Sequence, residues 1–232
     1  MRNTEQWRET KWTLKDGKLV PKNVHRSSLH TATLQAATYQ RAVERFAKAP
    51  IADLGCGEVP LYVLYRDIDP DPFCVDWGKS KHDVRHADWI CDLNQGIDIV
   101  GIEIEIRSID SPMIDYNFGT VCAWDMIEHL WNPRTIFYEA ADMLESGGHF
   151  ICAAPFMYWI HEAPHDYHRY TEYGLRKYCE LAGLEVVECE PYGDANDVLL
   201  DMTAKTGFGG LTQAIMNQHR FPLGYTLIAR KP

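Results

Sequence analysis

The segment from Pro155 to Thr171 is rich in side chains that can move protons or bind polar ligands. It holds three histidines, two acids and one arginine among several aromatic rings. Histidine and aspartate can take a proton from a hydroxyl, so we predict His161 and Asp166 as candidate catalytic bases. Rings and charged groups together suit a sugar, and the candidate substrate contacts are Tyr158, His165, Arg169 and Tyr170, with His129 from an earlier segment.

Structural roles are alternatives for several of these side chains. Asp166 and Arg169 can pair to hold the loop, and Thr171 is spaced to cap the helix that follows. His129 can cap its own helix or fill space. These alternatives are weaker for His161, which we retain as a proton acceptor.

The three histidines at 161, 165 and 168 also have a spacing that could bind a metal ion. A His-x-x-x-His pair needs a helix to face one ion, and Pro164 interrupts any such helix. We therefore predict no metal site for this segment.

A second chemical signal is the apolar run that contains Asp53 and breaks into Gly55-Cys56-Gly57. Such a run predicts a buried strand turning sharply into a helix, where glycine backbone approaches a ligand closely and N–H groups favour an anion. A dinucleotide fingerprint requires a third glycine where this chain has Pro60, which disfavours a dehydrogenase. Asp76 ends a later apolar run and offers two oxygens to two adjacent hydroxyls.

Further motifs follow in order: Asp92-Leu93 after an apolar segment, Glu128-His129-Leu130 after Val121–Asp125, and Gly147-Gly148 before another apolar run. From about residue 30 onward the chain resembles the class I S-adenosylmethionine-dependent methyltransferases. This resemblance implies that Asp76 binds ribose, that Asp92 and the N–H of Leu93 bind adenine, and that S-adenosyl-L-methionine is the cofactor. The candidate cofactor contacts are Asp53, Gly55, Gly57, Asp76, Trp77, Asp92, Leu93 and Trp124.

The segment after Pro155 also resembles the pattern Pro-Phe, His-Glu, Pro, Asp-Tyr, Arg-Tyr-Thr of methyltransferases often encoded among surface-polysaccharide genes. This resemblance implies O-methylation of a sugar or glycan precursor in polysaccharide biosynthesis. N- or C-methylation of a small metabolite is one alternative, and a catalytically inactive cofactor-binding regulatory protein is another. An inactive relative would be expected to lose polar groups from the crevice, and this chain keeps them.

Apolar runs alternate with helical patterns, which predicts an α/β fold with a Rossmann-like, mostly parallel sheet and helices on both faces. We expect seven strands near 50–55, 72–76, 88–92, 119–124, 148–154, 185–190 and 224–230. The family resemblance implies that the last strand is antiparallel. We expect helices near 33–48, 60–66, 133–145 and 172–182. Alternation over 99–109 suggests an added edge strand or hairpin.

The length of 232 residues suits an N-terminal arm over residues 1–30 followed by one methyltransferase domain over residues 31–232. A net charge of -10 without a basic cluster disfavours nucleic acid, so we expect a small-molecule or glycan acceptor. The arm is expected to fold onto the domain or onto a partner in a homodimer. Seven cysteines without a CxxC motif indicate reduced core thiols, and we predict a cytoplasmic protein without a membrane span.

Overall fold

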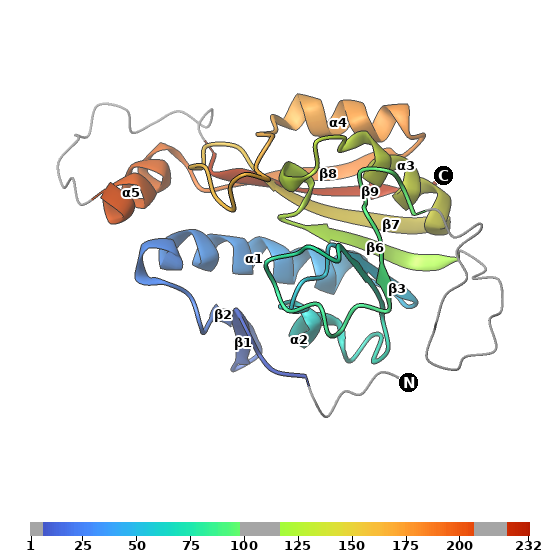
Figure 1. Ribbon diagram of the computed structural model, residues 1–232, viewed down its shortest axis with the longest axis horizontal. Coiled ribbons are helices and arrows are strands. Elements are labelled where there is room, and N and C mark those ends of the chain that lie inside the picture. Colours follow the sequence, from blue (N-terminus) through green and yellow to red (C-terminus); the bar gives the residue numbers. More distant parts are fainter. Residues whose placement is uncertain (1–6, 98–116, 207–221) are drawn as a thin grey trace.

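The computed structural model of the chain describes residues 7–97, 117–206 and 222–232 (Figure 1). Within these ranges a seven-stranded sheet has the order β5-β4-β3-β6-β7-β9-β8. All neighbouring strands are parallel except at β9, which is antiparallel to both β7 and β8. The bounds are β3 Ile51–Leu54, β4 Phe73–Asp76, β5 Trp89–Ile90, β6 Phe118–Trp124, β7 Leu144–Pro155, β8 Glu185–Tyr192 and β9 Gly224–Arg230. The predicted fold, including the antiparallel last strand, is confirmed.

Helices cover both faces of this sheet, as predicted (Figure 1). One face carries α1 (Leu29–Phe46) and the short α2 (Tyr62–Tyr65), and the other carries α3 (Arg134–Met143) and α4 (Glu172–Leu181). A fifth helix, α5 (Ala195–Thr206), contacts α1, and short 3-10 turns span Arg26–Ser28 and Ile127–His129. None of the helices in the described ranges combines the length and apolarity that crossing a bilayer requires.

The central strand β6 shows why both faces must be covered. Val121 and Ala123 pack in the cluster that includes Phe137 of α3, whereas Cys122 packs in the cluster that includes Tyr39 of α1. Successive side chains of a strand point to opposite faces, so a parallel strand that is apolar throughout is buried on both. The continuous apolar run in the sequence therefore corresponds to a strand between two helical layers.

The described part of the N-terminal arm forms a hairpin, β1 (Trp12–Lys15) and β2 (Lys18–Pro21), that packs on α1. Asp16 and Gly17 close its turn with φ of 52° and 73°. Trp12 is 1% exposed and packs edge-on against Tyr39, with ring centroids 5.8 Å apart. Burial of this large ring holds the hairpin against α1.

Three details differ from the sequence predictions. The helix expected over 133–145 ends at Met143, and β7 begins directly after it at Leu144. The pairing of β7 with β6 is irregular between Leu144 and His149, and Gly147 lies in this stretch with φ of 76°. The first helix starts at Leu29 rather than near 33. Neither the β1–β2 hairpin nor α5 was expected, although the Asp16-Gly17 pair that closes the hairpin is a local turn signal in the sequence. The strand or hairpin predicted over 99–109 lies outside the described residues.

Candidate functional site

A cavity of about 960 Å³ opens beside the carboxyl ends of β3, β4, β6 and β7. The strand order reverses between β3 and β6, which is where open α/β sheets bind their ligands. All predicted cofactor contacts except Asp53 line this cavity. Of the predicted catalytic and substrate residues, His129, Tyr158, His161 and His165 line it, whereas Asp166, Arg169 and Tyr170 do not.

The glycine turn after β3 forms one wall of the cavity. Gly55 has φ of 71° and Gly57 has φ of 51°, in the left-handed region that glycine adopts without strain. The N–H of Gly55 and the N–H of Cys56 both donate to the carbonyl of Val75 in β4. A Cβ atom on Gly55 would lie 2.8 Å from the side chain of Met126, so the turn leaves no room for a larger residue there.

Alanine at Gly55 is expected to lower the melting temperature more than alanine at Gly147. Both glycines have positive φ, so each change introduces backbone strain of about 1–2 kcal/mol. Only the Gly55→Ala methyl group meets neighbouring atoms, because a Cβ on Gly147 would have nothing within 4 Å. Thermal unfolding followed by circular dichroism measures both variants, and equal melting temperatures would contradict the steric argument.

Asp76, the last residue of β4, directs its carboxylate at the glycine turn. Its Oδ2 accepts the N–H of Gly57 at 2.5 Å, and its Oδ1 accepts the N–H of Trp77 at 2.6 Å. The residue is buried but borders the cavity. A carboxylate has about four acceptor sites, so both oxygens can still accept hydrogen bonds from a ligand.

Asp53 has a different place from the one expected. It lies within β3 and is buried, and its Oδ2 accepts a hydrogen bond of 2.5 Å from the hydroxyl of Tyr65 on α2. Because side chains alternate along a strand, Asp53 points toward the helical layer that contains α1 and α2. The Asp53 carboxylate therefore supports α2 beneath the glycine turn.

The remaining cofactor candidates, Asp92, Leu93 and Trp124, also line the cavity. Asp92 Oδ1 accepts the backbone N–H and the side-chain amide of Asn94, at 3.1 and 2.8 Å. The carbonyl of Leu93 accepts the hydroxyl of Thr135 at 2.6 Å. Trp124, at the end of β6, lines the cavity and also packs against Tyr39, with ring centroids 4.8 Å apart. Trp124 thus belongs to both the core and the cavity.

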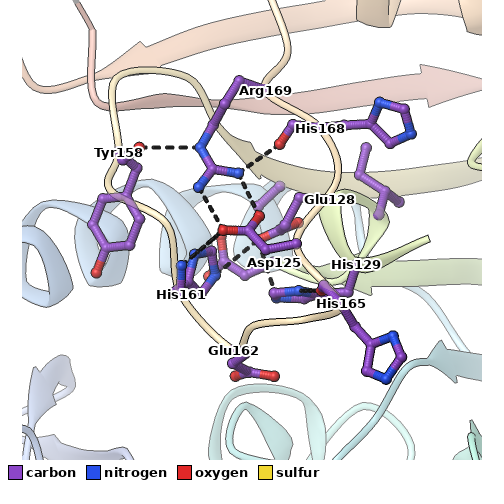
Figure 2. A network of polar contacts seen from close by, with 12 residues as sticks. Asp125, Glu128, His129, Tyr158, His161, Glu162, His165, His168 and Arg169 are labelled. Carbon is purple, nitrogen blue, oxygen red and sulfur yellow. Dashed lines mark hydrogen bonds and ion pairs between the residues drawn. The ribbon is translucent and has the colours of Figure 1, made fainter. Parts of the chain in front are cut away.

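Arg169 holds the segment after β7 in shape (Figure 2). Its guanidinium donates to both carboxylate oxygens of Asp166, at 2.6 and 2.8 Å, and to the backbone carbonyls of Tyr158, Trp159 and His168. A planar fork with five donors can join several acceptors in this way. The structural alternative for Asp166 and Arg169 is confirmed, and the predicted cap of α4 by Thr171 is present as well.

Asp166 contacts both the backbone and the ring of His161. Its Oδ2 accepts the N–H of His161 at 2.7 Å and lies 3.3 Å from the Nδ1 atom of the same residue. Burial alone would raise the pKa of Asp166, but the hydrogen bonds from Arg169 and the His161 backbone lower it to about 2. The carboxylate is therefore ionised, and its oxygens are hydrogen-bonded within this network. The hydroxyl of Tyr170 is also hydrogen-bonded within the protein, because it donates to the carbonyl of Ile127.

Glu128 was not among the site residues expected from the sequence. Its side chain is 1% exposed but borders the cavity, and neither carboxylate oxygen has a hydrogen-bond partner among the described residues. Its Oε1 lies 3.6 Å from Nε2 of His161 and 3.7 Å from Nε2 of His129 (Figure 2). Burial raises the pKa of Glu128 more than the neighbouring histidines lower it. The local signal for this residue was the Glu128-His129-Leu130 motif that follows the apolar run Val121–Asp125.

Asp125 is a second missed residue, at the turn that follows β6. It has φ of 48°, and its Oδ2 accepts the hydroxyl of Tyr39 at 2.7 Å and the amide of Gln35 at 3.0 Å. All of these hydrogen bonds come from α1. The helix therefore fixes the turn from which Glu128 and His129 reach the cavity.

Two loops meet across the cavity through His82 and Glu162. The Nε2 atom of His82 lies 3.1 Å from Oε1 of Glu162, and Lys81 donates to the carbonyl of Ala163 at 2.8 Å. The hydrogen bond to Glu162 raises the pKa of His82, and the same bond lowers the pKa of Glu162 to about 2. We call the His82–Glu162 contact the clasp. It joins the loop after β4 to the segment after β7.

No family model matches the chain, and no curated protein matches it in sequence. Solved structures match in fold. The [4+2]-cyclase SpnF is 15% identical with a TM-score of 0.55, over 97% of this chain and 88% of its own. A SAM-dependent methyltransferase from Archaeoglobus fulgidus is 13% identical with a TM-score of 0.53, over 84% of this chain and 94% of its own.

An S-adenosylmethionine-dependent methyltransferase from Mesorhizobium loti has a TM-score of 0.52 at 13% identity, over 87% of this chain and 99% of its own. Identities this low establish the fold and leave the activity to the residues of the site. Both methyltransferases and a cyclase are among these neighbours. The chain therefore has the Rossmann-like fold of the S-adenosylmethionine-dependent methyltransferases.

Proposed function

We propose that this protein is an S-adenosylmethionine-dependent methyltransferase that methylates a hydroxyl of a sugar or glycan precursor. One observation carries the proposal. A single cavity is lined both by the glycine turn with Asp76 and by the cluster of Glu128, His129 and His161. The glycine turn and Asp76 suit a nucleoside, and the cluster suits an acceptor that must lose a proton.

The residues of the glycine turn, together with Asp76, fit the cofactor. Gly55 and Gly57 let backbone approach a ligand, and Asp76 keeps acceptor sites on both oxygens for the two ribose hydroxyls. Asp92 and Leu93 border the part of the cavity proposed for adenine. When bound, the cofactor supplies a methyl group on a sulfonium sulfur, which becomes a neutral thioether as the methyl passes to the acceptor oxygen.

The protein's part in this reaction is to position the acceptor and remove its proton. Tyr158 and Trp131 offer rings to the apolar face of a sugar, while His161 and Glu128 face the same cavity. Of the two predicted bases, His161 is the better candidate, because it lines the cavity and Asp166 does not. Both oxygens of Asp166 accept from Arg169, and a pKa lowered to about 2 makes this carboxylate a weak proton acceptor. We propose that Nε2 of His161 takes the hydroxyl proton while Asp166 holds the ring.

Methyl transfer is tested with cofactor labelled in its methyl group. Purified protein is incubated with fractionated cell extract, nucleotide sugars and glycan precursors, and the labelled product is identified by mass spectrometry. The Asp76→Ala variant serves as the control for labelling by contaminants. Labelled sugar ether supports the proposal, whereas a labelled amine or carbon would assign N- or C-methylation. Cofactor binding without any labelled product would support the regulatory alternative.

The predicted location and assembly belong to this proposal as well. All seven cysteines are free thiols in the structure, which suits a reducing compartment such as the cytoplasm. The predicted homodimer stays a prediction. The acceptor class stays a small molecule or glycan because the net charge of -10 opposes a nucleic-acid backbone.

Cofactor affinity is expected to fall modestly as pH rises through the raised pKa of His82. The clasp joins two loops that line the cavity, and the raised pKa of His82 means that its protonation stabilises this contact. This contribution is fully present below the ordinary pKa of about 6.5 and is lost as pH rises through the raised pKa. Both side chains of the clasp are over one third exposed, so we expect only a few-fold change. Calorimetry with S-adenosylhomocysteine on either side of this range measures it. His82→Gln should flatten the profile, and an equally steep profile in that variant would exclude the clasp.

A further inference from the structure

Glu128, His129 and His161 come from two segments and converge at the cavity wall (Figure 2). The two imidazole Nε2 atoms lie 3.7 and 3.6 Å from the same oxygen of Glu128, and the potential ligand atoms of all three residues lie within 4.8 Å of one another. No hydrogen bond between described residues satisfies this buried carboxylate. Buried polar groups normally have partners, so the unsatisfied carboxylate needs an explanation.

The groups next to the two Nδ1 atoms determine which ring nitrogens of His129 and His161 carry hydrogen. Nδ1 of His129 lies 2.6 Å from the carbonyl oxygen of His165, which can only accept, so this nitrogen carries a hydrogen. Nδ1 of His161 lies 3.3 Å from the ionised Asp166 and 3.4 Å from the carbonyl of Trp159, and it must carry a hydrogen as well. In the neutral rings, both Nε2 atoms therefore present lone pairs.

Two lone pairs and a carboxylate that face one another repel unless a cation lies between them. A shared proton can relieve only one pair at a time, whereas a metal ion accepts all three donors at once. Ligand atoms about 2.1 Å from a tetrahedral ion lie roughly 3.4 Å apart, close to the separations of 3.6 and 3.7 Å observed here. Small rotations of the side chains would complete the geometry.

We propose that Glu128, His129 and His161 bind a divalent first-row transition-metal ion such as Zn²⁺. Two imidazoles and one carboxylate select zinc, iron, cobalt or nickel over magnesium or calcium, which prefer oxygen ligands. The outer partners also fit, because Asp166 and the His165 carbonyl orient the two rings from behind. Three protein ligands leave a position open toward the cavity, as in catalytic rather than structural zinc sites.

The consequence for catalysis rests on the proposed methyl transfer. In the ion-free protein His161 takes the acceptor proton. An ion held by Glu128, His129 and His161 would lower the pKa of an acceptor hydroxyl in the cavity, and the hydroxyl would then lose its proton to water. The acceptor oxygen then forms its bond to the methyl carbon as the carbon–sulfur bond of the sulfonium breaks. His161 becomes a ligand in this state.

Metal binding is tested without measuring activity. Protein stripped with a chelator is titrated with Zn²⁺ by calorimetry, and Co²⁺ is added as a coloured probe whose visible spectrum reports on the ligand set. We expect one ion per chain, with more than about 100-fold weaker binding in Glu128→Gln, His129→Asn and His161→Asn, beyond the effect typical of outer-shell changes. The matched control is His168→Asn, which removes an imidazole of the same segment that lies outside the cluster.

The outcomes separate the two proposals. Unchanged Zn²⁺ affinity in Glu128→Gln, or equal losses in His168→Asn and His161→Asn, would overturn the metal site. Melting temperatures of the ion-free variants show whether each one folds, and Glu128→Gln keeps the shape of the side chain. Failure of the stripped protein to bind added Zn²⁺, together with methyl transfer by the same preparation, would reject the ion and keep the enzyme. Zn²⁺ binding without cofactor binding would do the reverse.

Discussion

Replacing Asp76 with alanine is expected to weaken S-adenosylhomocysteine binding at least tenfold. The carboxylate is proposed to accept both ribose hydroxyls, and each hydrogen bond to a charged group contributes about 1.5–3 kcal/mol. The structure adds a second reason. Loss of the carboxylate leaves the N–H groups of Gly57 and Trp77 without their acceptor, which loosens the turn that lines the cavity.

Isothermal titration calorimetry with S-adenosylhomocysteine measures this effect. The matched control is Asp142→Ala, which removes an exposed acid of α3 and should leave the affinity unchanged. Unchanged affinity in a folded Asp76→Ala variant would remove Asp76 from the cofactor site. Tight binding of NAD by the unaltered protein would overturn the cofactor assignment as a whole.

Substituting His161 by alanine should separate turnover from cofactor binding. We expect turnover to fall by roughly 10²–10⁴, the usual contribution of a positioned base, while affinity for S-adenosylhomocysteine changes by no more than a few-fold. The physical reason is that the two groups of residues have different contacts. His161 contacts Glu128 and Asp166, whereas the proposed cofactor contacts at the glycine turn and Asp76 bond to one another.

The pH profile of the ion-free protein provides an independent readout. Burial lowers the pKa of His161, but Glu128 and Asp166 raise it more, so the net shift is upward. A base works only when deprotonated, and the rate should therefore fall as pH drops through this raised pKa. Near-normal rates in His161→Ala with a flat profile would instead favour positioning of an already nucleophilic nitrogen.

Asp166→Asn distinguishes a base from a supporting residue. The variant keeps the size of the side chain but loses the charge that faces Arg169 and the His161 ring. If Asp166 acts through His161, the change should shift the pH profile as well as the rate. A loss of rate without any shift of the profile would return Asp166 to the role of direct base.

Local patterns in the sequence were sufficient for most of the sheet. A parallel strand buried on both faces is largely apolar, so the runs ending at Leu54, Asp76 and Trp124 predict such strands. The glycine turn could also be predicted, because Gly55 and Gly57 directly follow an apolar run. The structure explains the glycines, since both have positive φ and a Cβ atom on Gly55 would meet Met126. Parallel strands place their ends at one edge, so the location of the cavity followed from the same patterns.

The assignment of individual side chains depended on contacts between distant segments. Asp53 and Asp76 both belong to apolar runs, but only packing shows that Tyr65 takes the first carboxylate and that the second borders the cavity. The sequence offered both Asp166 and His161 as bases, and it left open whether Asp166 pairs with Arg169. The contacts decide this, because Arg169 donates to both carboxylate oxygens of Asp166.

The sequence by itself determined the α/β sheet, the glycine turn and the presence of a polar segment after β7, because each depends on residues adjacent in the chain. Tertiary structure decided that Glu128 and His129 face His161, since β6 and β7 lie side by side in the sheet and bring the segments after them together. It also decided that Trp12 and the N-terminal hairpin pack on α1. Periodicity records which face of an element is buried, but the partner across that face depends on the order of the strands.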